Sequence, residues 1–100
     1  MNENIYLPHI MVIDKITVEA PGVKTFRLKF QNEEEAKAFQ FRAGNFAEYS
    51  AFGEGECTFC IASAPTREEY VECTFRHAGR VTSGLDRLEE GQTMGFRGPF

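Results

Sequence analysis

The chain has 100 residues and a net charge of −4, and 42% of its residues are hydrophobic and 26% charged. This is the size and composition of one globular domain, and it excludes a disordered tail, a collagen-like repeat and a coiled coil. The acidic balance argues against nucleic acid or an anionic membrane as the main partner. No apolar run is long enough to predict a membrane span, the N-terminus lacks the basic residues of a secretory signal, and the three cysteines form no disulfide framework. We therefore expect a cytoplasmic protein.

Six short strands are predicted in chain order, separated by turn residues. Residues 9–19 form the first, and an Ala-Pro-Gly turn follows it. In residues 23–30, Phe26, Leu28 and Phe30 alternate with polar residues, which is the period of a half-buried strand. Further strands are expected at residues 46–52, 56–62, 70–76 and 93–97.

Two short helices interrupt the strands. Asn32 is a candidate N-cap for a helix within residues 32–39, whose first turn holds three glutamates; a solvated acidic loop is the alternative. Val81, Leu85 and Leu88 lie on one side of a later helix, which we expect Thr82 or Ser83 to cap and Gly91 to end. The set predicts a mainly β fold, a closed six-stranded antiparallel barrel with one or two short helices.

The end of the chain predicts a longer protein. Residues 98–100 are a turn sequence directly after a predicted strand, with nothing following to cover it. We interpret residues 1–100 as one domain and as the N-terminal fragment of a longer chain.

Isolated reactive residues give no catalytic or metal assignment. Cys57 and Cys60 form a C-x-x-C, but residues three apart on a strand point to opposite faces, so two reduced cysteines are favoured over a metal site, which stays an alternative. His9 and His77 have no nucleophile at an informative position, so no catalytic triad is supported. The paired glutamates flank turns and are interpreted as solvated.

Residues 77–83 end a predicted strand and begin a predicted helix. Gly79 permits tight backbone geometry, Thr82 and Ser83 add hydroxyl groups, and Arg76 and Arg80 add positive charge. This pattern indicates a candidate phosphate cradle, with a plain capped helix as the alternative.

Several segments resemble, in order and spacing, motifs of the ferredoxin–NAD(P)+ reductase superfamily. They are Phe41-Arg42-Ala43-Gly44-Asn45-Phe46 for F-x-A/P-G-Q-F, residues 57–63 for R-x-Y-S/T, Gly79-Arg80-Val81-Thr82 for G-x-V/C-S/T, and residues 88–92 and 98–100 for L-x-x-G-D and G-P-x-G. Residues 6–9 and 25–28 are most similar to the branch of hydrogenase and sulfhydrogenase gamma subunits, anaerobic sulfite reductase B and dihydroorotate dehydrogenase electron-transfer subunits. The resemblance implies a Greek-key barrel that binds FAD, with FMN as an alternative.

The resemblance also implies roles for the residues by position. Phe59 takes the place of the tyrosine that packs on the isoalloxazine, and Cys60 the place of the serine or threonine near the flavin N5 edge. Cys57 departs from the pattern, because it takes the place of the arginine that pairs with the pyrophosphate, and this leaves weakened flavin binding, or none, open. The implied cofactor-binding set is Cys57, Thr58, Phe59, Cys60, Ile61, Arg76, Gly79, Arg80, Val81, Thr82 and Ser83.

The function implied by the resemblance is electron transfer between NAD(P)H and an iron–sulfur partner through FAD. The partner is expected to be an iron–sulfur subunit or a hydrogenase or reductase subunit. The chain has no G-x-G-x-x-G and no cysteine cluster for a [2Fe–2S] centre, so both sites are expected in a missing C-terminal part, and residues 1–100 alone are expected to lack dehydrogenase activity. The alternative function is that of a small, cofactor-free β-barrel that serves as a binding or interaction module.

Overall fold

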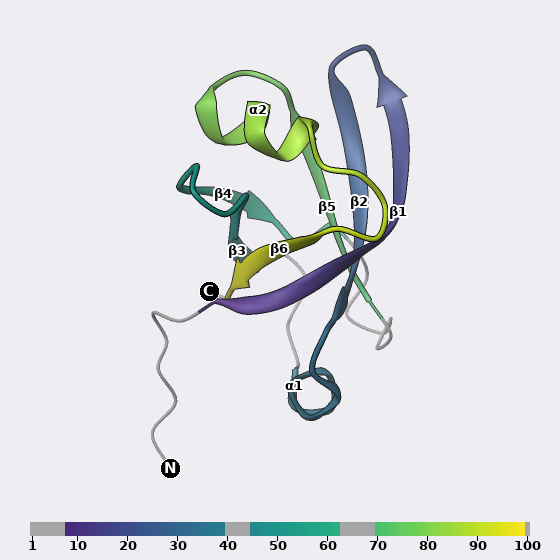
Figure 1. Cartoon of the computed structure of the whole chain (residues 1–100), viewed down its shortest axis with the longest axis vertical. Helices are drawn as coiled ribbons and strands as arrows, with labels where there is room; N and C mark the ends of the chain where they lie inside the picture. The colour runs from purple at the N-terminus through teal and green to yellow at the C-terminus, as the bar shows by residue number, and fades with distance from the viewer. Residues whose placement is uncertain (1–7, 40–44, 63–69, 100) are drawn as a thin grey trace.

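The computed structural model describes residues 8–39, 45–62 and 70–99, which form one antiparallel sheet and two short helices (Figure 1). The elements are β1 His9–Ala20, β2 Val23–Phe30, α1 Glu33–Ala38, β3 Phe46–Ser50, β4 Glu56–Cys60, β5 Val71–Arg76, α2 Arg80–Asp86 and β6 Thr93–Arg97. The strand order is β4-β3-β6-β1-β2-β5, so the last strand lies between the first and the third. The mainly β, six-stranded antiparallel fold with two short helices is confirmed.

The strands form because their apolar residues alternate. In β2 and β5, Phe26, Leu28, Val71, Cys73 and Phe75 all point to the interior and are almost completely buried. The Phe26 and Phe75 rings meet edge to face, with their centroids 4.9 Å apart. In this pair of strands, the apolar residues that alternate in the sequence are therefore the residues buried in the core.

The closed barrel that the sequence predicts is not observed in the described part of the chain, where β4 and β5 remain as the two ends of the sheet. They approach each other from opposite sides of the interior, where the Phe59 and Phe75 rings lie 6.4 Å apart. The Ala62 N–H donates to the Glu72 carbonyl at 2.8 Å just beyond β4, and no ladder joins the two strands themselves. We call this gap between β4 and β5 the open seam.

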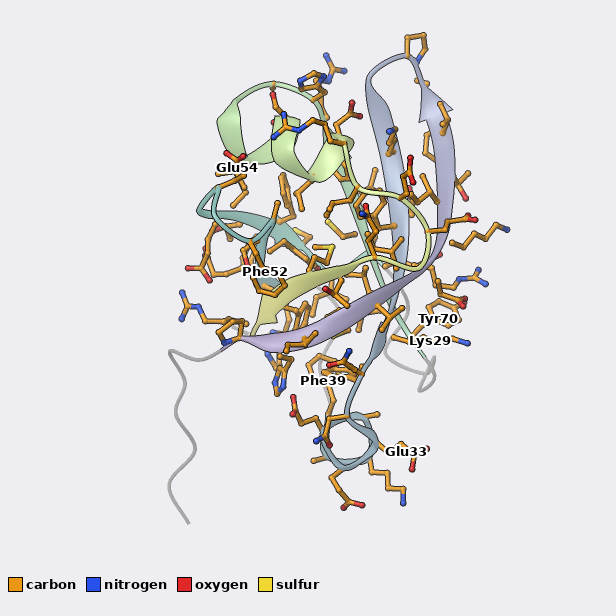
Figure 2. The ribbon with its side chains drawn as sticks, in the orientation of Figure 1. Lys29, Glu33, Phe39, Phe52, Glu54 and Tyr70 are labelled. Carbon is orange, nitrogen blue, oxygen red and sulfur yellow. The ribbon has the colours of Figure 1, made fainter. Side chains whose placement is uncertain are left out.

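The helix α1 confirms the predicted cap. The Asn32 side chain accepts hydrogen bonds from the backbone N–H groups of Glu34 and Glu35, at 2.9 and 3.1 Å. The Glu35 carboxylate also contacts His9 on β1, and Phe39 packs against the core between α1 and the sheet (Figure 2). The alternative of a solvated loop is therefore set aside.

The helix α2 begins earlier than predicted. Its N-cap is Gly79, not Thr82 or Ser83, because the Thr82 hydroxyl bonds backward to the backbone of the preceding residues from inside the first turn. The helix ends at Asp86, so Gly91 does not end it, and Leu88 packs on the core from the segment after it. Neither helix in the described ranges is long and apolar enough to cross a membrane.

Candidate functional site

Close packing of α2 on the turn between β3 and β4 forms the base of the candidate site. A Cβ at Gly84 would lie 2.8 Å from Glu54 Cγ and 3.2 Å from Ala51 Cβ, so only glycine allows this approach. Figure 2 shows Glu54 at the turn beneath α2, where its carboxylate pairs with Arg87 at 3.1 Å. A Cβ at Gly55 would lie 3.4 Å from Val81, so the residue before β4 meets the first turn of α2. The two segments that resembled cofactor motifs are thus neighbours.

The Thr82 hydroxyl is fully committed to the backbone. It accepts hydrogen bonds from the N–H groups of Ala78 and Gly79, at 2.9 and 2.8 Å, and donates to the Gly79 carbonyl at 3.2 Å. A hydroxyl has one donor and two acceptor positions, and all three are used here. Thr82 is also buried. Its side chain therefore shapes the start of α2 and has no hydrogen-bonding capacity left for a ligand.

A polar network adjoins this turn on the β5 side. The His77 Nε2 and Ser83 Oγ atoms are 2.7 Å apart, and His77 Nδ1 lies 3.8 Å from the Asp86 carboxylate. Lys24 from β2 pairs with the same carboxylate at 3.2 Å and donates to the Asp86 carbonyl at 2.9 Å. His77 itself is about half exposed, with 47% of its side chain open to solvent. The network therefore presents the His77 imidazole and the Ser83 hydroxyl at the surface. Asp86 contacts the imidazole, and Lys24 pairs with Asp86.

The strand β4 shows the alternation that the sequence predicted. Cys57 and Phe59 are half-buried and share the inner face, whereas Thr58 and Cys60 are exposed on the other face. The Phe59 ring lies 5.9 Å from the ring of Tyr49. Cys57 and Cys60 thus point to opposite faces, and the described residues contain no cluster of three or more metal-ligating side chains.

Cys57 carries no charge that would replace an arginine. Burial raises the pKa of its thiol, and the nearby Glu48 carboxylate raises this pKa further. The thiol is therefore the dominant form at neutral pH, and a neutral thiol neither attracts phosphate nor acts as a strong nucleophile.

The other predicted site residues divide between core, surface and undescribed parts. Ile61 is buried, and its N–H donates to the Asn45 carbonyl at 2.9 Å, so its side chain belongs to the core. Arg76 is exposed at the end of β5. The backbone of Arg80 begins α2, while its side chain lies outside the described part of the chain. Residues 40–44 and 63–69, which carry parts of two motifs, also lie outside it.

Sequence reasoning missed the part played by His77, which it interpreted as an isolated histidine. His77 lies just after the end of β5, and Ser83 and Asp86 lie on α2, so their spacing in the sequence follows no helical or strand period. Only the turn at 78–79 brings the three together. No periodicity could have revealed this contact.

The residues present fit a phosphate-bearing ligand. Gly79 is exposed, and a Cβ placed on it would meet nothing within 4 Å, so the backbone here is open to close approach. His77 and Ser83 supply hydrogen-bonding groups beside this turn, and Arg76 precedes it at the end of β5.

No family model matches the chain. It is similar to sulfhydrogenase 1 subunit gamma of Pyrococcus furiosus, with 34% identity over 99% of this chain and 34% of that subunit. It is also similar to a probable electron-transfer subunit of dihydroorotate dehydrogenase B (NAD(+)) from Methanothermobacter thermautotrophicus, with 26% identity over 98% of this chain and 35% of that subunit. The chain thus spans about a third of the length of the curated relatives it matches.

Solved structures share the fold. An Amycolatopsis cytochrome P450 reductase superposes with a TM-score of 0.76 and 20% identity, over 94% of this chain and 28% of that one. An NADH-dependent reduced ferredoxin–NADP oxidoreductase superposes with a TM-score of 0.71 and 22% identity, over 99% of this chain and 34% of that one. The identities are low, so these two comparisons establish the fold alone.

Proposed function

Starting from its homology to sulfhydrogenase gamma subunits and its fold in common with ferredoxin–NADP reductases, we propose that this chain is the flavin-binding domain of an electron-transfer oxidoreductase subunit. The observation that carries the proposal is the packing of α2 against the start of β4 through Gly55 and Gly84. It brings β4 beside the first turn of α2, so a ring system held at β4 and a phosphate held at Gly79 would lie on neighbouring segments.

Specific residues would hold the flavin on this surface. Phe59 and Cys60 are at the end of β4 and at the open seam, where we place the ring system. Gly79, Val81 and Ser83 belong to the turn and helix where we place the phosphate. A bound flavin supplies the chemistry that converts two-electron exchange with a nicotinamide into one-electron exchange with an iron–sulfur centre, and the protein supplies binding and orientation.

The charge that Cys57 lacks is assigned to other residues. A neutral thiol contributes nothing to the attraction of a phosphate, and the chain carries a net charge of −4. Arg76, Arg80 and His77 are the basic residues next to Gly79 in the chain, and we propose that they supply the positive charge. FAD is the cofactor we propose, and FMN is the alternative.

The same proposal covers the cellular location, the partner subunit and the other cofactor sites of the whole protein. The gamma subunit and the electron-transfer subunit to which the chain is similar are named as parts of larger enzymes. We propose by analogy a cytoplasmic complex in which this domain exchanges electrons with an iron–sulfur, hydrogenase or reductase subunit. We propose that the NAD(P) site and any [2Fe–2S] centre lie in residues other than these 100.

The test is retention of flavin by the purified chain. The visible absorption and fluorescence spectra are recorded before and after addition of FAD and desalting, for the wild type and for Phe59→Leu. The leucine keeps most of the volume that Phe59 contributes beside Tyr49 but removes the aromatic plane, so we expect the flavin to dissociate while the thermal midpoint changes little. Phe52→Leu, at a phenylalanine that is 55% exposed, is the matched control and should retain the flavin.

A cofactor-free binding module is the competing function. It predicts that neither FAD nor FMN is retained by the wild type, and that Phe59→Leu alters stability alone. A colourless wild type that stays folded after incubation with either flavin would overturn the proposed function.

A further inference from the structure

We propose that the free edge of β1, at residues 15–19, pairs with the same edge of a second copy of this chain to form an antiparallel, two-fold symmetric dimer. In this dimer Thr17 of one copy lies opposite Thr17 of the other. The inference goes beyond the proposed function and does not depend on flavin binding.

Only the first part of β1 is paired on both sides. The strand β2 accompanies β1 to its end at Ala20, whereas β6 pairs with it only from His9 to Val12. Two backbone hydrogen bonds, of 2.9 and 2.8 Å, continue this contact to Ile13. Beyond that point no strand in the described part of the chain pairs with this side of β1, so residues 15–19 form an edge. Figure 1 shows this part of β1 and β2 as a hairpin that extends past the loop between α2 and β6.

One hydrogen bond shows how the backbone is oriented at this edge. The Ile16 N–H donates to the Glu90 carboxylate at 2.9 Å, and Glu90 lies in the segment between α2 and β6. The backbone groups of Ile16 therefore point away from β2. Because these groups alternate between the two sides of a strand, those of Thr17 point to β2, where Thr25 is opposite, and those of Val18 point to the free edge.

The side chains at this edge are open to solvent. Val18 is 67% exposed, and Lys15, Thr17 and Glu19 are exposed as well. An apolar side chain on an unpaired strand edge favours the addition of another strand. Register shifts relative to β2 bound this stretch at both ends, so the edge is short. We therefore expect a weak dimer.

The sequence of the edge is complementary to itself. An antiparallel pair centred on Thr17 places Lys15 of each copy opposite Glu19 of the other, which gives two contacts between opposite charges. It also places Ile16 opposite Val18, and these are the two residues whose backbone groups point to the edge. A pair centred on Ile16 or on Val18 brings neither lysine opposite a glutamate. Charge and backbone geometry thus select the same register.

Glu90 limits access to this edge. In the dimer the Ile16 N–H donates to the Val18 carbonyl of the other copy, so it must first release the Glu90 carboxylate. A charged side chain that occupies a strand edge opposes the addition of a second strand. Removal of this carboxylate should therefore tighten the dimer.

The experiment measures the monomer–dimer equilibrium of the full chain. Sedimentation equilibrium is recorded up to about 1 mM protein, because a short interface gives a weak association. We expect Lys15→Glu and Glu19→Lys each to weaken the dimer by about tenfold, since a symmetric dimer contains each changed contact twice. The double variant Lys15→Glu/Glu19→Lys restores opposite charges and should recover the wild-type dissociation constant. Glu90→Ala should lower it.

A backbone variant and a charge control complete the set. Val18→Pro removes an N–H that points to the free edge, and proline is tolerated at such a position of an edge strand. It should abolish the dimer while the thermal midpoint changes little. Glu33→Lys, on α1 in Figure 2, changes the net charge as Glu19→Lys does and should leave the dimer unchanged.

The outcomes decide the proposal without reference to flavin. Protection of the Val18 amide from hydrogen exchange that rises with protein concentration, while that of Thr17 stays constant, would support it. A wild type that remains monomeric up to about 1 mM would overturn it and leave the edge to a strand of another protein. A dimer that the double variant does not restore would overturn the register, and one that none of these substitutions changes would place the interface elsewhere.

Discussion

At the scale of single residues, two buried polar atoms in the described part of the chain have no hydrogen-bond partner: Arg27 Nε and the hydroxyl of Tyr49. The Tyr49 side chain is completely buried beside Phe96 and Phe59, and its hydroxyl has no hydrogen-bond partner in the described structure. Burial raises the pKa of Tyr49, and the Cys73 and Cys60 thiols raise it further, so the phenol stays protonated. A buried donor without an acceptor lowers stability.

Tyr49→Phe is therefore expected to stabilise the protein. Removal of the unsatisfied hydroxyl while the ring stays should raise the free energy of unfolding by about 1 kcal/mol. The measurement is chemical denaturation followed by circular dichroism. Tyr70→Phe is the control, because the Tyr70 ring lies 4.3 Å from the Arg27 guanidinium and that contact survives the loss of the hydroxyl. A stability loss in Tyr49→Phe would show that the hydroxyl has a partner.

At the scale of elements, the position of α2 decides whether the two parts of the candidate site meet. Its contacts with the β3–β4 turn involve Gly84, the Glu54–Arg87 ion pair and the approach of Gly55 to Val81. Lys24 on β2 holds the other end of the helix through Asp86. A helix of seven residues is not stable by itself, so these tertiary contacts fix both its formation and its place.

Gly84→Ala tests this arrangement. Alanine gains about 1 kcal/mol of helix propensity over glycine, but its Cβ would meet Ala51 and Glu54 at 2.8–3.2 Å, and overpacking costs about 1–3 kcal/mol. The cost of overpacking should exceed the gain in helix propensity. We therefore expect a net loss of about 1 kcal/mol in the free energy of unfolding and weaker flavin binding.

Gly79→Ala is the comparison for Gly84→Ala. A Cβ at Gly79 has open space and the backbone there is extended, so the thermal midpoint should hardly change. If the phosphate approaches this backbone, flavin affinity should fall in this variant alone without a loss of stability. Equal thermal midpoints for Gly84→Ala and the wild type would contradict the close packing of α2.

At the scale of the whole molecule, the sheet is firmly paired in the middle and open at its ends. The strand β1 pairs with both β6 and β2, whereas β4 and β5 each have one paired neighbour in the described sheet. The open seam therefore leaves one edge of each strand without a ladder. In the proposed function this edge faces the ring system of the flavin.

Hydrogen exchange should report the difference. We expect backbone amides of β4 to exchange faster than those of β1, because a strand with a single paired neighbour opens more readily. Addition of FAD should slow exchange in β4 and at residues 77–83 and leave β1 unchanged. The measurement is exchange followed by mass spectrometry or NMR. Exchange in β4 that is as slow as in β1 without flavin would indicate a closed barrel in solution.

The sequence by itself determined the strands, the cap of α1 and the two faces of β4, because these depend on local periodicity and on hydrogen bonds between near neighbours. The alternation in residues 23–30, the Asn32 cap and the half-buried pair Cys57 and Phe59 all follow from such patterns. The cofactor roles came from a resemblance in motif order, and they stay predictions for the individual residues.

The tertiary structure alone decided where the sheet opens, where α2 begins and which hydroxyl is free. The Thr82 hydroxyl forms its hydrogen bonds within its own turn. Ser83 instead contacts His77, which lies between β5 and that turn. Gly84 is needed because a turn some 30 residues earlier in the chain packs against it. These facts depend on contacts between segments distant in sequence or on the path of one turn, and such contacts leave no period in the sequence to be detected.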